Sequence, residues 1–274
     1  MQPLEFIKHT PRSNCGECGY AACLAFAAAV TKGGEDPGKC PYIDLSGLGE
    51  EFCGQNRGKD GLDGVGKLLD EKDLALVAYL KKKTAAIDFS QAAESIGCTW
   101  SGRERDSLLL KFLGQDIEIS HDTILLDGNP AEDPRDQILL YNYVHFGGGP
   151  EPGGQWIGME SLPNSISKIR TLRVYCEERI ADHFSGKVEL LKQEAVALGA
   201  ILQENPEQSC SGAFLVPALP RLPLFVLFWD EEEEDGFPAK VKVLFDQNVL
   251  DFLDIESLVF VCERMAEHWV GAGK

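Results

Sequence analysis

The sequence predicts an α+β protein in which a small cysteine-rich module precedes a larger domain of helices and antiparallel strands. Its strand-like segments come in clusters between clusters of helix-like segments, which favours α+β over a doubly wound sheet. Four of the nine cysteines fall within the first 40 residues, and residues 44–66 are rich in glycine. These observations predict a module at 1–43, a glycine-rich linker at 44–66 and an α+β domain at 67–274.

The charge and hydropathy of the chain exclude several classes of protein. The net charge is −18, from 44 acidic and 26 basic residues, and such a surface repels nucleic acid and anionic lipid headgroups. No window approaches the ~18–20 uninterrupted apolar residues of a membrane span, and the N-terminus lacks the pattern of a secretory signal. We therefore expect no nucleic-acid partner, no membrane span and a reducing, cytoplasmic setting, which suits the odd number of cysteines.

The module is predicted to contain one helix. Residues 20–32 are rich in alanine, the best helix former, and the glycines that follow at 33 and 34 are typical of a helix end. Cys23 would lie in the first turn of this helix. Phe26, Ala27 and Val30 would share its side of the helix, because residues three, four and seven positions apart lie on one face.

The first half of the larger domain is predicted to contain two helices and three strands. One helix spans 71–83, with Asp70 as its cap, and a shorter helix runs from its cap Ser90 to Ile96 and is ended by Gly97. A β-hairpin pairs 107–113 with 116–120 around Gly114 and Gln115, and a third strand follows at 123–126.

The second half alternates helices and strands less regularly. Helices are predicted at 134–143, 164–184, 186–198 and 254–269, the third ended by Gly199 and the last capped by Asp254. Strands are predicted at 212–218, 222–229 and 240–245. Pro217, Pro220 and Pro223 favour edge positions or a tight crossover for the first two of these strands, because proline cannot donate to the ladder.

The four N-terminal cysteines have the spacing C-x2-C-x4-C-x16-C. Thiols gathered this closely, in a chain without an export signal, indicate a metal or an iron–sulfur cluster before disulfides. Gly16 and Gly19 would let the backbone turn tightly around a cluster, and Pro41 follows the last cysteine as it often does in ferredoxin-like sites. A zinc site is the alternative, but zinc sites usually bring two C-x2-C pairs or a histidine pair, and here there is one pair.

The run from Asn14 to Ala27, together with Cys40 and Pro41, resembles the four-cysteine [4Fe-4S] module of the large subunit of the corrinoid iron–sulfur protein and of the Rnf complex B subunit. This resemblance implies that Cys15, Cys18, Cys23 and Cys40 bind a [4Fe-4S] cluster. It also implies a redox partner protein, of a corrinoid or carbon monoxide dehydrogenase system. The rest of the chain resembles an uncharacterised domain of unknown function found in anaerobic bacteria and archaea, through residues 155–163, 220–230 and 237–246.

Other candidate residues have simpler interpretations. Cys53 lies alone in the glycine-rich linker and is interpreted as incidental. His145 precedes a glycine run and is interpreted as a structural histidine. The six consecutive acids at 230–235 lack the alternating ligands of a calcium loop, so we expect a solvated turn. The glycines at 147–154 do not match a nucleotide-binding motif.

Three functional hypotheses follow from these patterns. The leading hypothesis is an iron–sulfur protein of anaerobic metabolism that passes single electrons to or from a partner protein. The second is a cluster-dependent redox enzyme with a small-molecule pocket near Gln155–Glu160 and Trp229. The third is a structural or regulatory cluster protein. The sequence contains no arrangement of residues that indicates nucleophilic catalysis.

Overall fold

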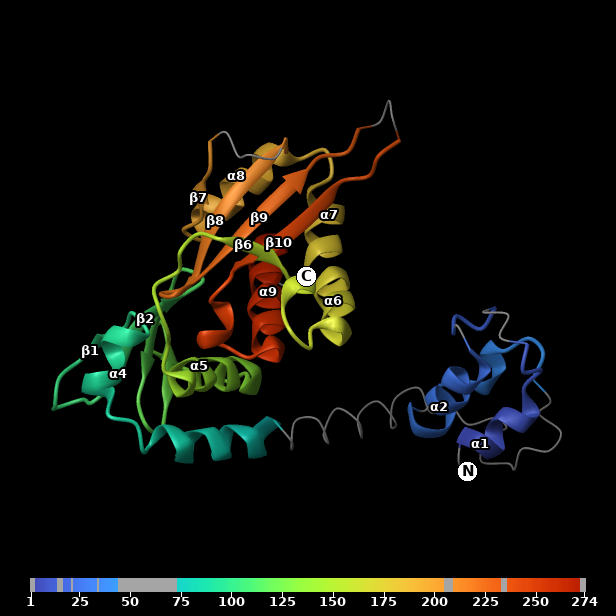
Figure 1. Ribbon diagram of the computed structural model, residues 1–274, viewed down its shortest axis with the longest axis horizontal. Coiled ribbons are helices and arrows are strands. Elements are labelled where there is room, and N and C mark those ends of the chain that lie inside the picture. Colours follow the sequence, from blue (N-terminus) through green and yellow to red (C-terminus); the bar gives the residue numbers. More distant parts are fainter. Residues whose placement is uncertain are drawn as a thin grey trace. The chain divides into compact units, whose positions relative to one another are not determined.

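The computed structural model describes residues 3–13, 17–20, 22–33, 35–43, 73–204, 209–232 and 236–271. The chain divides into two compact units, residues 1–71 and 72–274 (Figure 1). The predicted linker at 44–66, and Asp70, Cys15 and Cys53, lie outside the described residues. The described part of the first unit is helical, and the second unit combines helices with two antiparallel sheets, which confirms the predicted α+β class.

The first unit is built from short helices around a small apolar core. Its described elements are α1 (Pro3–Phe6), η1 (Ile7–His9), α2 (Cys23–Gly33) and η2 (Pro37–Lys39). The buried core residues come from α1, from α2 and from the end of η2: Phe6, Phe26, Ala27, Val30 and Cys40. The predicted helix is confirmed, and it begins at Cys23 rather than at residue 20.

The second unit begins its described part with helical residues 73–84, followed by α4 (Phe89–Ser95) and a five-stranded antiparallel meander. The strands are β1 (Thr99–Trp100), β2 (Leu108–Phe112), β3 (Gln115–Ile119), β4 (Ile124–Leu126) and β5 (Asn129–Pro130). The predicted hairpin and third strand are confirmed, although the turn is Leu113-Gly114. Both turn residues have positive φ, 47° and 86°, as a tight two-residue hairpin turn requires.

A second antiparallel sheet has the strand order β6-β10-β9-β8-β7. These strands are β6 (Trp156–Gly158), β7 (Ile201–Leu202), β8 (Gly212–Leu219), β9 (Leu222–Trp229) and β10 (Lys240–Asp246). The hairpin turn of the first sheet reaches this second sheet, because the Leu113 N–H donates to the Ala218 carbonyl at 2.9 Å. The two sheets therefore share one core.

Of the two alternatives predicted from the prolines, edge positions are wrong, because β8 and β9 both lie inside the sheet. The connection between the two strands is tight, and Pro220 lies in its two-residue turn. Pro217 pairs with Pro223 near the closed end of the hairpin. The ladder of β9 with β10 begins at Leu224, and that of β8 with β7 reaches Leu215. Pro217 therefore lies beyond the pairing of β8 with β7, and Pro223 lies beyond the pairing of β9 with β10. At neither proline would the missing N–H donate to that neighbouring strand.

The remaining helices of this unit are α5 (Pro134–Phe146), α6 (Ile166–Leu172), α7 (Glu178–Phe184), α8 (Val188–Ala197) and α9 (Ile255–Val270), with the short 3₁₀ turns η3 (Met159–Ser161) and η5 (Val249–Asp251). Figure 1 shows α7, α8 and α9 on one face of the second sheet. The buried residues of β9 on that face alternate as Leu222, Leu224, Val226 and Phe228. This face and the helices enclose the core of the unit.

Two helices differ from the sequence predictions, one in where it begins and one in its interior. The cap of α4 is Asp88, whose side chain accepts from the Ser90 N–H at 3.0 Å, so Ser90 is a helical residue rather than the cap. The predicted helix 164–184 contains a π-helical segment, η4 (Arg173–Glu177), between α6 and α7. A π-helical turn takes an extra residue, which changes the direction of every side chain that follows it.

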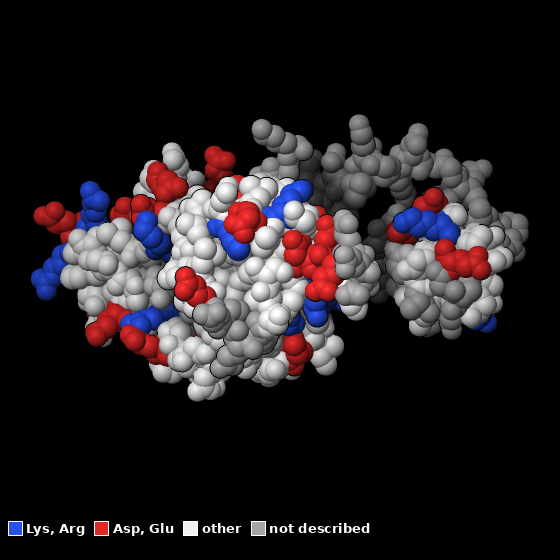
Figure 2. Space-filling model, turned by 90° about the horizontal axis from the view of Figure 1, so that it is seen from above, with Lys and Arg blue, Asp and Glu red and all other residues white. Residues whose placement is uncertain are grey.

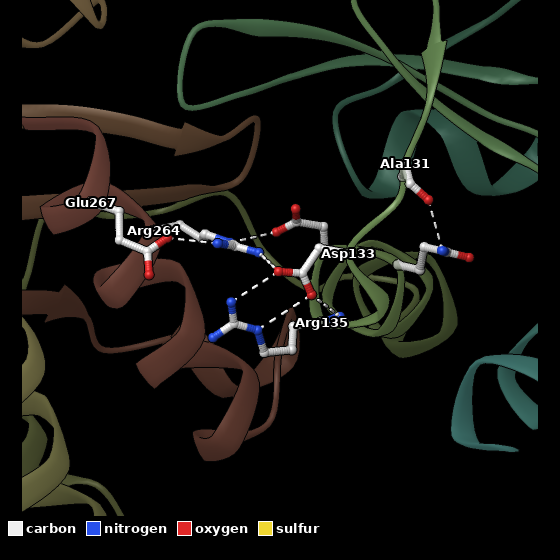
Figure 3. A network of polar contacts seen from close by, with 7 residues as sticks. Ala131, Asp133, Arg135, Arg264 and Glu267 are labelled. Carbon is white, nitrogen blue, oxygen red and sulfur yellow. Dashed lines mark hydrogen bonds and ion pairs between the residues drawn. The ribbon is translucent and has the colours of Figure 1, made fainter. Parts of the chain in front are cut away.

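A network of ion pairs joins α5 to α9 (Figure 3). Arg264 of α9 donates to Asp133 and, at 2.7 Å, to Asp136, at the start of α5. It also donates to Glu267 at 2.6 Å. Arg135 also donates to Asp133, at 2.9 Å, through the same carboxylate oxygen that Arg264 contacts, so two guanidinium groups bind the Asp133 carboxylate, as Figure 3 shows.

Candidate functional site

Three of the four predicted cluster ligands lie in the described part of the first unit. Cys18 lies in a turn and is half-buried, whereas Cys23 and Cys40 are 6% and 5% exposed. Cys23 is the first residue of α2, and Cys40 is the residue that ends η2. Cys15 lies outside the described residues.

These cysteines share one apolar environment. Cys40 belongs to the small core of the first unit, and Cys18 packs against that core. Cys23 lies on the same face of α2 as Phe26 and Val30, which are also part of the core. Cys18 and Cys40, which are 22 residues apart in the sequence, therefore pack on one apolar core, and Cys23 is buried at the start of the helix that supplies Phe26, Ala27 and Val30 to that core.

The turn before α2 is shaped by glycine, and the turn before Cys40 by an aspartate cap. Gly19 has a φ of 83°, a conformation that other residues rarely adopt, and it lies directly after Cys18. Asp36 accepts from the Gly38 N–H at 2.8 Å and so caps η2. The Cys40 N–H then donates to the Pro37 carbonyl at 3.2 Å, which fixes the backbone at this cysteine.

Polar contacts near the cysteines join two segments of the first unit. The Tyr20 hydroxyl donates to Glu35 at 2.7 Å, and Lys39 forms an ion pair with Glu35 at 3.0 Å. The hydrogen bond from Tyr20 and that from Lys39 lower the pKa of Glu35, and the same contacts raise the pKa of Tyr20 and of Lys39. The segment before α2 is thereby tied to the segment that carries Cys40.

The thiols fit an iron–sulfur cluster in chemistry and in environment. Thiolate sulfur is the ligand of such clusters, and an apolar border on one side limits the access of water. Among the described residues, no group of three or more His, Cys, Asp or Glu side chains is close enough to hold a metal ion. The described thiols alone therefore do not form a closed ligand set, and the predicted set includes Cys15.

Other predicted candidates are placed in the second unit. His145 lies in the last turn of α5, 3.4 Å from the Lys83 ammonium, and is exposed. Cys176 and Cys262 are fully buried. Trp229 lines a pocket, whereas Gln155–Glu160 contributes β6 and η3 and does not line it.

The sequence did not predict two polar contacts. One joins Tyr20 and Lys39 to Glu35. In the other, the Tyr42 hydroxyl donates to Glu17 at 3.0 Å. The spacing of Glu35 and Lys39 was a signal for the first, because oppositely charged residues four apart often pair. The sequence also did not predict the lining of the pocket by η4, because the π-helical turn that directs Glu177 has no sequence signature.

The architecture defines a class of protein: an α+β domain preceded by a cysteine module. Residues 88–268 match the family described as "Domain of unknown function (DUF3786)", which covers more than half of the chain. The protein belongs to this family. Residues 11–42, which include the four N-terminal cysteines, match a family described as "Putative Fe-S cluster".

Relatives with curated names match the N-terminal part. The "Acetyl-CoA decarbonylase/synthase complex subunit gamma 2" of Methanosarcina thermophila is 49% identical over 41 residues, which is 15% of this chain and 9% of that protein. The "Corrinoid/iron-sulfur protein large subunit" of Moorella thermoacetica is 48% identical over 40 residues, again 15% and 9%. The B subunit of the ion-translocating oxidoreductase complex of Ectopseudomonas mendocina (strain ymp) is 32% identical over 89 residues, 32% of this chain and 39% of that protein.

The chain thus spans a minor part of the length of these relatives, from 9% to 39%. No solved structure matches it. Across the described residues, every helix is too short or too polar to cross a membrane. The comparisons support an iron–sulfur cofactor and leave the second unit without a named activity.

Proposed function

We propose that the first unit binds a [4Fe-4S] cluster through Cys15, Cys18, Cys23 and Cys40, and that the protein transfers single electrons to or from a partner protein. One observation carries the proposal. Cys18 and Cys40 pack on one apolar core, and Cys23 is buried at the start of the helix that contributes to that core, all within the segment that matches an iron–sulfur family. When bound, such a cluster supplies a one-electron redox centre.

The residues around the thiols have separate roles in this proposal. Cys23 lies at the N-terminus of α2, where backbone N–H groups without helical partners favour an anionic group. Phe26 and Val30 keep water from the inner side of the site. The contact of Tyr20 with Glu35 holds together the two segments that carry the ligands.

A partner protein of an anaerobic, corrinoid or carbon monoxide dehydrogenase system is part of the proposal. The support is that two of the relatives are named as subunits of complexes, and a third as a corrinoid/iron-sulfur protein. A net charge of −18 favours a partner with a basic docking surface. A reducing, cytoplasmic setting, proposed here as well, suits a chain with nine cysteines.

Purification without oxygen, followed by metal analysis and EPR, tests the proposal. We expect about four iron ions and four acid-labile sulfides per chain, and a rhombic signal that appears after reduction with dithionite. In Cys18→Ser the signal and the sulfide content fall severalfold, because one ligand is lost while the core residues remain.

Cys210→Ser is the matched control. Cys210 is a half-buried thiol of the second unit, so its loss leaves iron, sulfide and signal unchanged. A protein that carries zinc without iron or sulfide contradicts the proposal. An unchanged signal in Cys18→Ser contradicts the ligand assignment.

A further inference from the structure

The second unit contains a pocket of ≈ 670 Å³ that none of the comparisons explains. It is bordered by η4 and α7 on one side, and by the end of β9 and residues 237–241 on the other. Its volume lies within the range of about 300–1,000 Å³ that is usual for small-molecule sites. All of its lining residues belong to the second unit.

Glu177 is the buried charged residue of this pocket. It is 8% exposed. Its Oε1 accepts at 3.0 Å from the N–H of Val243, a residue of β10 that has no partner in β6. The nearest cation, the Lys242 ammonium, is 3.8 Å from the same oxygen. Within the described part of the chain, Oε2 has no hydrogen-bond partner. Oε2 is not among the fully buried atoms that lack a partner, so this oxygen of a largely buried carboxylate is accessible to a ligand that donates to it.

The aromatic side of the pocket already accommodates a cation. The Lys240 ammonium lies 5.7 Å from the centre of the Trp229 ring. The indole N–H of Trp229 donates to the Ser209 carbonyl at 2.6 Å, which fixes the plane of the ring. Phe237, at 64% exposed, adds a second aromatic surface at the rim. A fixed indole face attracts cations and also binds apolar groups.

The charge of the lining favours a cationic ligand over an anionic one. Its acidic residues outnumber the two basic ones, Arg173 and Lys240; they are Glu177, Glu178, Asp182, Asp230 and Glu232. Arg173 is neutralised by Glu178 at 3.2 Å. Figure 2 shows that acidic side chains gather next to one another on this unit. A carboxylate ligand would therefore meet net repulsion.

We propose that this pocket binds a small organic ammonium compound, whose ammonium group donates to Glu177 and whose apolar part lies against Trp229. The buried acceptor fixes the position of the charge. The indole ring and Phe237 bind the rest of the molecule, and the surrounding carboxylates attract it. Lys240 occupies the ring face in the absence of ligand and competes with it.

Calorimetric titration of the full chain with three probes of one skeleton tests the proposal: 4-phenylbutylamine, 4-phenylbutan-1-ol and 4-phenylbutyrate. We expect the amine to bind about tenfold more tightly than the alcohol, the size of a hydrogen bond to a charged group, and the acid not to bind. Glu177→Gln keeps the acceptor for Val243 and removes the charge, so it abolishes this tenfold preference. Lys240→Gln strengthens amine binding about two- to fivefold, because the competing cation is removed.

Glu160→Gln is the matched control, because Glu160 binds the ammonium of Lys242 at 3.0 Å and does not line the pocket. Its amine affinity stays within twofold of the unchanged protein. Circular dichroism confirms that each variant is folded. The proposal is overturned if 4-phenylbutyrate binds more tightly than 4-phenylbutylamine and this binding is lost in Lys240→Gln. Binding of a lysine-rich peptide when none of the three probes binds also overturns it, since the surface would then be a protein docking site.

Discussion

At the scale of single residues, Arg264 links three carboxylates of the second unit. It is 16% exposed and reaches three carboxylates, those of Asp133, Asp136 and Glu267. Burial acts to raise the pKa of Asp133, but the hydrogen bonds from Arg135 and Arg264 outweigh it and lower the pKa to about 2. For Asp136 burial prevails, and the pKa is raised.

Arg264→Gln is expected to lower the free energy of unfolding by about 2 kcal/mol, less than the 3–5 kcal/mol of a fully buried pair because the carboxylates are partly exposed. The loss arises because Asp136 keeps its charge without a partner. Arg135→Gln removes a cation whose side chain is 40% exposed, so it costs under about 1 kcal/mol. Urea unfolding at neutral pH measures both variants.

The pH dependence of the same measurement has a definite sign. Because the folded pKa of Asp133 is depressed, its contribution is present above the unfolded value and is lost as the pH falls through about 2. The difference between the unchanged protein and Arg264→Gln should therefore be largest at neutral pH and shrink from about pH 4 downwards. A difference that grows in acid would show that Asp133 does not stabilise the network.

At the scale of elements, capping side chains stabilise the starts of the helices. Asp254 caps α9: its Oδ1 accepts from the Ser257 N–H at 2.8 Å, and its Oδ2 from Asn142 at 3.2 Å. We expect Asp254→Ala to destabilise the protein by about 1–2 kcal/mol, because a helix N–H and the Asn142 amide both lose an acceptor.

Asp254→Asn is the control for this prediction. Asparagine is as good a cap as aspartate, but its NH2 group replaces one of the two acceptor oxygens, so this variant keeps the cap and loses the acceptor for Asn142. It should therefore be about 1 kcal/mol more stable than Asp254→Ala. Chemical unfolding followed by circular dichroism compares the two. If the alanine and asparagine variants lost equal stability, the charge of Asp254 or its contact with Asn142, rather than its cap, would stabilise α9.

The elements also show which local features the sequence determines. The cap of α9 and the hairpin of β2 and β3 are predictable, since each depends on residues a few positions apart. The cap of α4 is not, because Asp88 and Ser90 are equally good caps by type. The π-helical turn at η4 and the place of the prolines inside the sheet depend on neighbours distant in sequence, which no local pattern records.

The candidate sites differ in the same way. The spacing of the four cysteines alone predicts a ligand set, because a cluster requires particular residue types at particular intervals, and this assignment stays a prediction. The pocket is only partly predictable: Trp229 lines it as expected, but Glu177 and Lys240 carry no signal of it in the sequence. Glu177 faces Val243 through the packing of η4 against the edge of β10, a contact between residues 66 positions apart.

At the scale of the whole molecule, the described residues form two separate hydrophobic cores of unequal size. In its described part, the core of the first unit consists of five buried residues, one of them Cys40. A unit of this length does not usually form a large enough core to be stable without a metal or disulfides. The second unit has a core that joins both of its sheets and its helices.

Calorimetry of the full chain should therefore show two unfolding transitions with different dependences. When iron is removed with a chelator under oxidising conditions, the transition of the first unit should vanish or move to a lower temperature, because metal binding supplies part of its folding free energy. The transition of the second unit should stay within about 2 °C, since its core contains no predicted ligand.

Arg264→Gln is the reverse experiment. It should lower the second transition temperature by several degrees, because the variant loses about 2 kcal/mol, and it should leave the first transition unchanged. A single transition that moves in both experiments would contradict the independence of the two cores.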